Sequence, residues 1–179
     1  MITSEQARRL EILRKQPAVP AMRLIDQTGQ AFHFGEWVKE KNKFLIVDFI
    51  YTKCQSLCRA LGTEFQQLQR SIVERGLQNR VHLLSVSFDP EHDSYTVLRQ
   101  YADHLQARPD IWTFATVGKS SDLVALLRTF GVIVISDQQG GFQHNAALVW
   151  VAQSGKLVRV TDYDASAPLQ LLDELAGAN

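Results

Sequence analysis

The sequence of 179 residues predicts an α/β fold in one domain, and three observations support this prediction. Residues 44–51 form a nearly continuous apolar run, which is typical of a central strand buried on both faces. A helical period follows it, and a second β-rich run over residues 81–88 is again followed by a helical period. Alternating strands and helices indicate a parallel sheet. In the last third, a β-hairpin pattern and a closing helix replace this alternation.

The elements before the central strand are short. The first of them is a charged, partly amphipathic helix that ends before Pro17 and Pro20, because proline cannot continue a helix. The turn-rich residues 26–30 then separate two short β-rich segments, which predicts an antiparallel hairpin. The expected elements are a helix over residues 4–15, strands over 22–25 and 31–34, and a helix over 36–40.

The elements after the central strand alternate until the hairpin near the C-terminus. In the long helix from Cys54, apolar residues recur every three or four positions, which marks one buried face. Ser120 or Ser121 and Gly131 fit the two ends of a later helix, and Ser166 fits the start of the last one. The expected elements are helices over 54–76, 95–105, 121–130 and 168–175, and strands over 44–51, 81–88, 111–117, 142–152 and 156–161.

A parallel β-α-β half followed by a hairpin and a helix is the thioredoxin-like plan. We therefore predict a thioredoxin-like fold with an N-terminal β-hairpin extension and a central mixed sheet flanked by helices. Residues 1–20 are assigned to an N-terminal helix and linker, and residues 21–179 to the thioredoxin-like domain.

Charge and hydropathy exclude several classes of protein. Lysine plus arginine equals aspartate plus glutamate at 19 each, so no net field attracts a polyanion such as nucleic acid. No apolar run approaches the 18 or more residues of a membrane-spanning helix. The first twenty residues lack the apolar core of a signal peptide. We expect a soluble chain, either in its natural state or without an anchor that once preceded it.

Cys54 and Cys58 are the only cysteines, and they lie together at the end of the central strand. On a regular helix, residues four apart have Cβ atoms about 5–6 Å apart, whereas a disulfide requires about 3.5–4.5 Å. A metal bound by two thiolates spans the larger gap, so the spacing favours a metal. At or before the first helical position, however, the backbone at Cys54 can bend toward Cys58, which lessens this preference for a metal. The positive end of the helix dipole, with Lys53 and Arg59 nearby, favours thiolate.

Other interpretations of the pair are weaker. Cysteine is often a small buried apolar residue. Structural zinc usually takes four Cys or His ligands in closely spaced pairs, and the chain has no second such pair. Thiolate with imidazole is a ligand set for copper, and Cu(I) favours the sulfurs.

His144 is the candidate third ligand. It follows a flexible glycine-containing loop, residues 138–141, of the kind that can close over a site at the rim of a sheet. The remaining histidines fit surface or structural positions better: His33, His82, His92 and His104.

These residues resemble the Sco/SenC family of copper-delivery proteins for cytochrome c oxidase. The matching stretches are residues 49–58 (FIYTKCQSLC), residues 85–93 (SVSFDPEHD), and His144 with the strand and turn that follow it. The resemblance implies a thioredoxin-like fold from about residue 20 onward, and Cys54, Cys58 and His144 as ligands of Cu(I) or Cu(II). Asp89 matches an acidic position that lies near the metal without binding it.

By this resemblance we expect a metallochaperone that delivers copper to the copper-site subunit of cytochrome c oxidase. The expected location is the periplasm, or a membrane anchor facing it, with other copper chaperones or thioredoxin-like reductants as further partners. The alternative is a thiol-disulfide oxidoreductase in which Cys54 attacks and Cys58 resolves, passing through a disulfide bond, although the usual redox motif has one residue fewer between the thiols. A peroxidase-like thiol and an adaptor without site chemistry are weaker alternatives.

Overall fold

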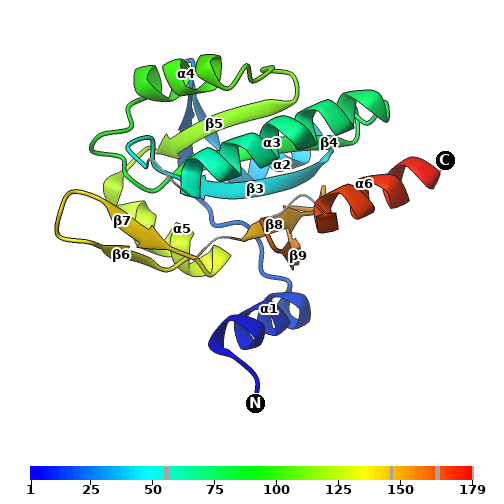
Figure 1. Cartoon of the computed structure of the whole chain (residues 1–179), viewed down its shortest axis with the longest axis horizontal. Coiled ribbons are helices and arrows are strands. Elements are labelled where there is room, and N and C mark those ends of the chain that lie inside the picture. The colour runs from blue at the N-terminus through cyan, green and yellow to red at the C-terminus, as the bar shows by residue number, and fades with distance from the viewer. Residues whose placement is uncertain (55–56, 146, 164–165, 179) are drawn as a thin grey trace.

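The structure, a computed structural model, describes residues 1–54, 57–145, 147–163 and 166–178, and for residues 57–61 it describes the backbone alone. A seven-stranded sheet in the order β2-β1-β5-β4-β3-β8-β9 forms the centre of the fold (Figure 1). Its strands are β1 (Arg23–Asp26), β2 (Ala31–His33), β3 (Phe44–Ile50), β4 (Val81–Ser87), β5 (Trp112–Val117), β8 (Leu148–Val151) and β9 (Leu157–Thr161). Strands β3, β4 and β5 are parallel, and their outer neighbours are antiparallel. The predicted mixed sheet is confirmed.

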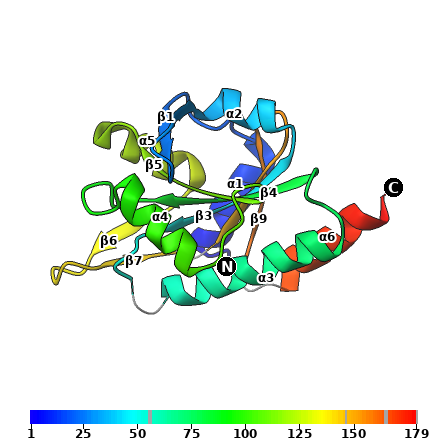
Figure 2. The same cartoon turned by 90° about the horizontal axis from the view of Figure 1, so that it is seen from above.

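Helices cover both faces of this sheet (Figure 2). One face packs against α1, α2 and α5, and the other against α3, α4 and α6. The described helices are α1 (Ser4–Lys15), α2 (Phe34–Lys41), α3 (Leu57–Glu74), α4 (Tyr95–His104), α5 (Leu123–Phe130) and α6 (Ser166–Gly177), with a 3-10 turn, η1 (Ser120–Asp122). In β3, Val47 and Phe49 join the first core, and Ile46 and Ile50 join the second. Burial on both sides explains the continuous apolar run in the sequence.

The predicted helix starts are wrong in several places. Helix α2 begins at Phe34 because the His33 imidazole accepts the Glu36 amide and caps it. Neither serine caps α5, since both lie in η1. Ser166 is itself helical in α6. At the other end of α5, Gly131 adopts the expected left-handed conformation with φ of 67°.

The predicted strand over residues 142–152 is also wrong, because it is two strands in different sheets. Its first part, β7 (Phe142–His144), pairs with β6 (Val134–Ser136), which the sequence did not predict. Its second part, β8, pairs with β3 and β9 in the main sheet. The β6–β7 hairpin therefore forms a separate arm, and this arm carries His144.

Two ionisable side chains are buried in the sheet away from this arm. Burial raises the pKa of Asp48 to about 7, although Ser85 donates a hydrogen bond to its carboxylate. Asp48 Oδ1 has no hydrogen-bond partner among the described residues. Burial, with Lys41 and Lys43 nearby, lowers the pKa of His82 to about 3. Its Nε2 lies 2.7 Å from Thr113 Oγ1. At neutral pH His82 is thus neutral, and the Asp48 carboxyl is close to its midpoint.

The N-terminal segment packs against the end of the sheet. Ile12 of α1 is buried in the first core, and the backbone of Pro17, Ala18 and Val19 pairs with residues 155–157. The division into residues 1–20 and 21–179 stays a prediction. None of the helices in the described part of the chain has the length and apolar character needed to cross a membrane.

Candidate metal site

Cys54 lies between β3 and α3. Its backbone amide donates to Tyr51 O over 3.2 Å, and its half-buried side chain packs against the first core. Helix α3 begins at Leu57, so the predicted helix start at Cys54 is wrong. The Cβ spacing of a regular helix therefore does not apply to Cys54 and Cys58, and it does not exclude a direct disulfide between them. Cys58 lies in the first turn of α3, and its side chain is outside the described residues.

A buried carboxylate holds the segment that leads to Cys54. Asp93 is fully buried, and it accepts hydrogen bonds from Thr52 N over 3.1 Å, from Thr52 Oγ1, and from Ser87 Oγ over 2.7 Å. Thr52 follows β3, and Ser87 ends β4. Asp93 therefore ties the ends of two parallel strands to the turn that carries Cys54.

Tyr51 joins this turn to the β6–β7 arm. Its hydroxyl donates to Phe142 O over 3.1 Å and accepts from Phe142 N over 3.2 Å. The Tyr51 ring also meets the His144 ring edge-on, with centroids 6.4 Å apart, and Phe88 meets His144 at 5.0 Å. His144 is thus held against Tyr51, which lies three residues before Cys54.

The two ring nitrogens of His144 have different surroundings. Nδ1 lies 3.2 Å from the backbone oxygen of Asn145, which can only accept, so Nδ1 carries the proton. Nε2 is buried and has no hydrogen-bond partner in the described part of the chain. Burial lowers the pKa of His144, which keeps the imidazole neutral. A neutral imidazole with an unshared electron pair on Nε2 is the form that binds a metal.

Asp89 is buried, and its carboxylate contacts a neighbouring histidine. Its carboxylate lies 3.0 Å from His92 Nδ1, and its backbone amide donates to Ser87 Oγ. It directly follows Phe88, which contacts the His144 ring. This position near His144 is compatible with a supporting role in the site.

The described side chains include two of the three predicted ligands, Cys54 and His144. Among the residues whose side chains are described, no group of three or more His, Cys, Asp or Glu forms a metal site. The Cys58 side chain is not among them. Tyr51, Asn145 and Asp93 shape the site, and we did not single them out from the sequence. The sequence signals were indirect: Tyr51 and Asp93 lie in the stretches 49–58 and 85–93, and Asn145 follows His144.

Comparison with known families decides the relationship. The sequence model of the SCO1/SenC family matches residues 11–178. The chain belongs to the SCO1/SenC family. A curated relative, the SCO1 protein homolog of Bacillus subtilis (strain 168), is 28% identical over 127 residues. That alignment covers 69% of this chain and 63% of the relative, so it spans less than two thirds of the relative's length.

Solved structures of the SCO1/SenC family share the fold. A SCO1/SenC family lipoprotein from Bacillus anthracis has a TM-score of 0.78 at 20% identity, covering 90% of this chain and 96% of that one. Arabidopsis thaliana ScoI with copper bound has a TM-score of 0.74 at 16% identity, covering 90% of this chain and 99% of that one. BsSco, described as a member of the Sco family of cytochrome c oxidase assembly proteins and studied for a disulfide switch, has 0.74 at 21% identity, covering 90% and 95%. At these identities the likeness shows the thioredoxin-like fold alone.

Proposed function

We propose that this SCO1/SenC protein is a copper carrier that delivers the metal to the copper-site subunit of cytochrome c oxidase. The observation that carries the proposal is His144 Nε2, which is buried and has no hydrogen-bond partner among the described residues. Its ring lies against Tyr51, just before Cys54. Copper bound in a Sco structure and a Sco protein in oxidase assembly support the cargo and the partner.

In this proposal, Cys54 and Cys58 bind copper as thiolates and His144 binds it through Nε2. Two thiolates and one Cu(I) sum to a charge of −1, which the N-terminus of α3 and the nearby Lys53 offset. Cu(II) brings the same ligands to zero, so both oxidation states are compatible with the site. Three ligands leave coordination positions open, through which the thiolates of an acceptor capture the metal by ligand exchange.

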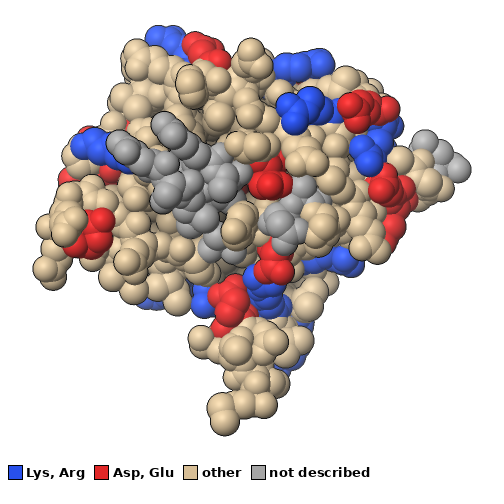
Figure 3. Space-filling view, viewed as in Figure 1, with Lys and Arg blue, Asp and Glu red and all other residues tan. Residues whose placement is uncertain are grey.

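The cellular location is also proposed from the relatives of this chain. One family member of the same fold is a lipoprotein. We place this chain outside the cytoplasm, at the membrane face where the oxidase receives its copper. On the face drawn in Figure 3, basic and acidic side chains are interspersed over the described surface, which suits a protein partner better than a polyanion.

Copper titration of the reduced protein tests the proposal. We expect one copper per chain and a thiolate-to-Cu(II) charge-transfer absorption. His144→Ala should weaken Cu(II) binding by at least about tenfold and Cu(I) binding less, since imidazole suits the divalent ion and thiolate the monovalent one. The exposed His104 of α4 supplies the control, His104→Ala, which should bind copper as the wild type does. Equal retention of both ions by His144→Ala would contradict the assignment of the third ligand.

A second candidate function is thiol-disulfide exchange, favoured by the position of Cys54 before the start of α3. The Cys54 thiolate attacks a substrate disulfide and releases one substrate thiolate. The Cys58 thiolate then attacks Cys54 Sγ, which releases the second substrate thiol and leaves a Cys54–Cys58 disulfide. Two electrons pass to the substrate, and a thioredoxin-like dithiol restores the reduced protein.

The reduction potential of the cysteine pair separates this candidate from the carrier. A reductase should show a potential near the thioredoxin value of about −270 mV and no stable copper complex. A stable one-to-one copper complex, with a potential far above that value, would exclude the reductase and favour the carrier.

A further inference from the structure

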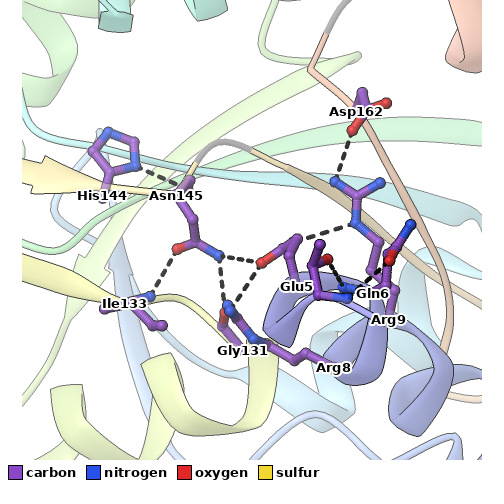
Figure 4. A network of polar contacts seen from close by, with 10 residues as sticks. Glu5, Gln6, Arg8, Arg9, Gly131, Ile133, His144, Asn145 and Asp162 are labelled. Carbon is purple, nitrogen blue, oxygen red and sulfur yellow. Dashed lines mark hydrogen bonds and ion pairs between the residues drawn. The ribbon is translucent and has the colours of Figure 1, made fainter. Parts of the chain in front are cut away.

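Asn145 connects three segments around the copper ligand His144 (Figure 4). Its side-chain Oδ1 accepts the amide of Ile133 over 2.8 Å. Its Nδ2 donates to Gly131 O over 3.1 Å and to Glu5 Oε2 over 3.5 Å. Both ends of the amide are therefore used, and the backbone amide of Asn145 adds a bond to Ile133 O. The position of Asn145 is fixed by groups far from it in the sequence.

The groups that hold Asn145 form a frame around it, and helix α1 supplies one side of this frame. Glu5 pairs with Arg8 over 2.8 Å and with Arg9 over 3.2 Å. Arg8 also donates to Gly131 O, the same carbonyl that accepts from Asn145. The Arg8 side chain fills the space beside Gly131, where an added Cβ would clash with Arg8 Cδ. Because Gly131 has no side chain, α1 can approach the C-terminal end of α5 closely.

The frame reaches the metal site through one backbone oxygen. Asn145 O faces His144 Nδ1 at 3.2 Å. Since this oxygen can only accept, it selects the tautomer that leaves the electron pair on Nε2. A partner of this kind fixes both the tautomer and the direction of a metal-binding imidazole.

We propose that Asn145 is a positioning residue of the copper site and that α1, through Glu5 and Arg8, is part of the frame that holds it. This inference rests on the proposed function, because the orientation of the His144 ring affects copper binding only if His144 is the third ligand. Asn145 acts through the His144 ring, by way of its backbone oxygen.

The test compares Asn145→Ala and Glu5→Ala with a matched control, Glu11→Ala. Glu11 lies on the same helix, where it forms an exposed ion pair with Lys15. The ¹⁵N shifts of the His144 ring in the reduced, metal-free protein at pH 8 report the tautomer. We expect Nδ1–H in the wild type and in Glu11→Ala, and a mixture of tautomers in Asn145→Ala. Cu(II) affinity should fall about 10–100-fold in Asn145→Ala, with Cu(I) affinity less affected, and Glu5→Ala should change both readouts in the same direction by less.

A wild type with the proton on Nε2, or an Asn145→Ala protein with unchanged tautomer and unchanged Cu(II) affinity, would overturn the inference. If Asn145→Ala does not fold, Glu5→Ala decides, and a tautomer equal to that of Glu11→Ala would overturn it. The tautomer measurement needs no copper. A wild type that fails to bind copper would therefore refute the proposed function, while the ring shifts would still test the role of Asn145.

Discussion

Asp48→Asn should raise the free energy of unfolding by roughly 2–4 kcal/mol at pH 8. The folded protein holds the Asp48 pKa at about 7, about three units above the ordinary value near 4 in the unfolded chain. Between pH 4 and 7 the folded state thus binds more protons, and its stability falls as the pH rises. Each unit corresponds to about 1.4 kcal/mol. The amide has no charge to bury, so the variant escapes this loss. Denaturant unfolding from pH 4 to 8 measures it.

The pH profile identifies the source of this gain. The unfolded chain protonates His82 near pH 6.5, whereas the folded state holds it neutral down to about 3, so His82 stabilises above pH 6.5 and loses this contribution toward pH 3. In the wild type the two residues oppose each other between pH 4 and 6.5. In Asp48→Asn only the His82 contribution remains, so the stability of this variant should rise with pH between about 3 and 6.5. Asp103→Asn, at an exposed position of α4, should follow the wild type. A difference between Asp48→Asn and wild type that stays constant from pH 4 to 8 would contradict this account.

Asp93→Ala should destabilise the protein by roughly 3–5 kcal/mol. The substitution leaves three donors from Thr52 and Ser87 without their buried acceptor, and each such intramolecular hydrogen bond contributes about 1–1.5 kcal/mol net. Denaturant unfolding at pH 7 measures the loss. We also expect weaker copper retention at temperatures where the variant is still folded, because the turn that carries Cys54 loses its anchor.

Two further variants show whether hydrogen bonding is the cause. Asp93→Asn keeps the size of the side chain and one accepting oxygen, so it should lose about half as much stability. Asp103→Ala removes an exposed aspartate of α4 and should change stability by less than about 0.5 kcal/mol. An Asp93→Ala protein as stable as Asp103→Ala would show that the three hydrogen bonds do not hold this turn.

The centre of the main sheet could be predicted because its central strands are long and buried. β3 and β4 are buried along almost their whole length, so their apolar runs stand out in the sequence. β6 could not be predicted in this way, since it has three residues and Ile135 in it is exposed. The break between β7 and β8 was hidden because apolar residues occur on both sides of it, while the pairing partners that separate the strands lie elsewhere in the chain.

The chemistry of the site was easier to predict than its support. Cys54, Cys58 and His144 are residue types whose reactivity is evident from the letters, and the chain has few of them. Tyr51 gave no such signal, because its role depends on hydrogen bonds to Phe142, 91 positions away. Asn145 and Glu5 are 140 positions apart. Contacts of this kind appear only when the chain is folded.

The separation of the β6–β7 arm from the main sheet also bears on how the protein can diverge. The arm shares no strand pairing with the seven-stranded sheet in the described residues, and its tip at Gln138–Gly140 is exposed. Insertions at this tip can therefore accumulate over evolution without shifting the register of the large sheet. A lineage can reshape the approach to the histidine in this way while inheriting an unchanged scaffold.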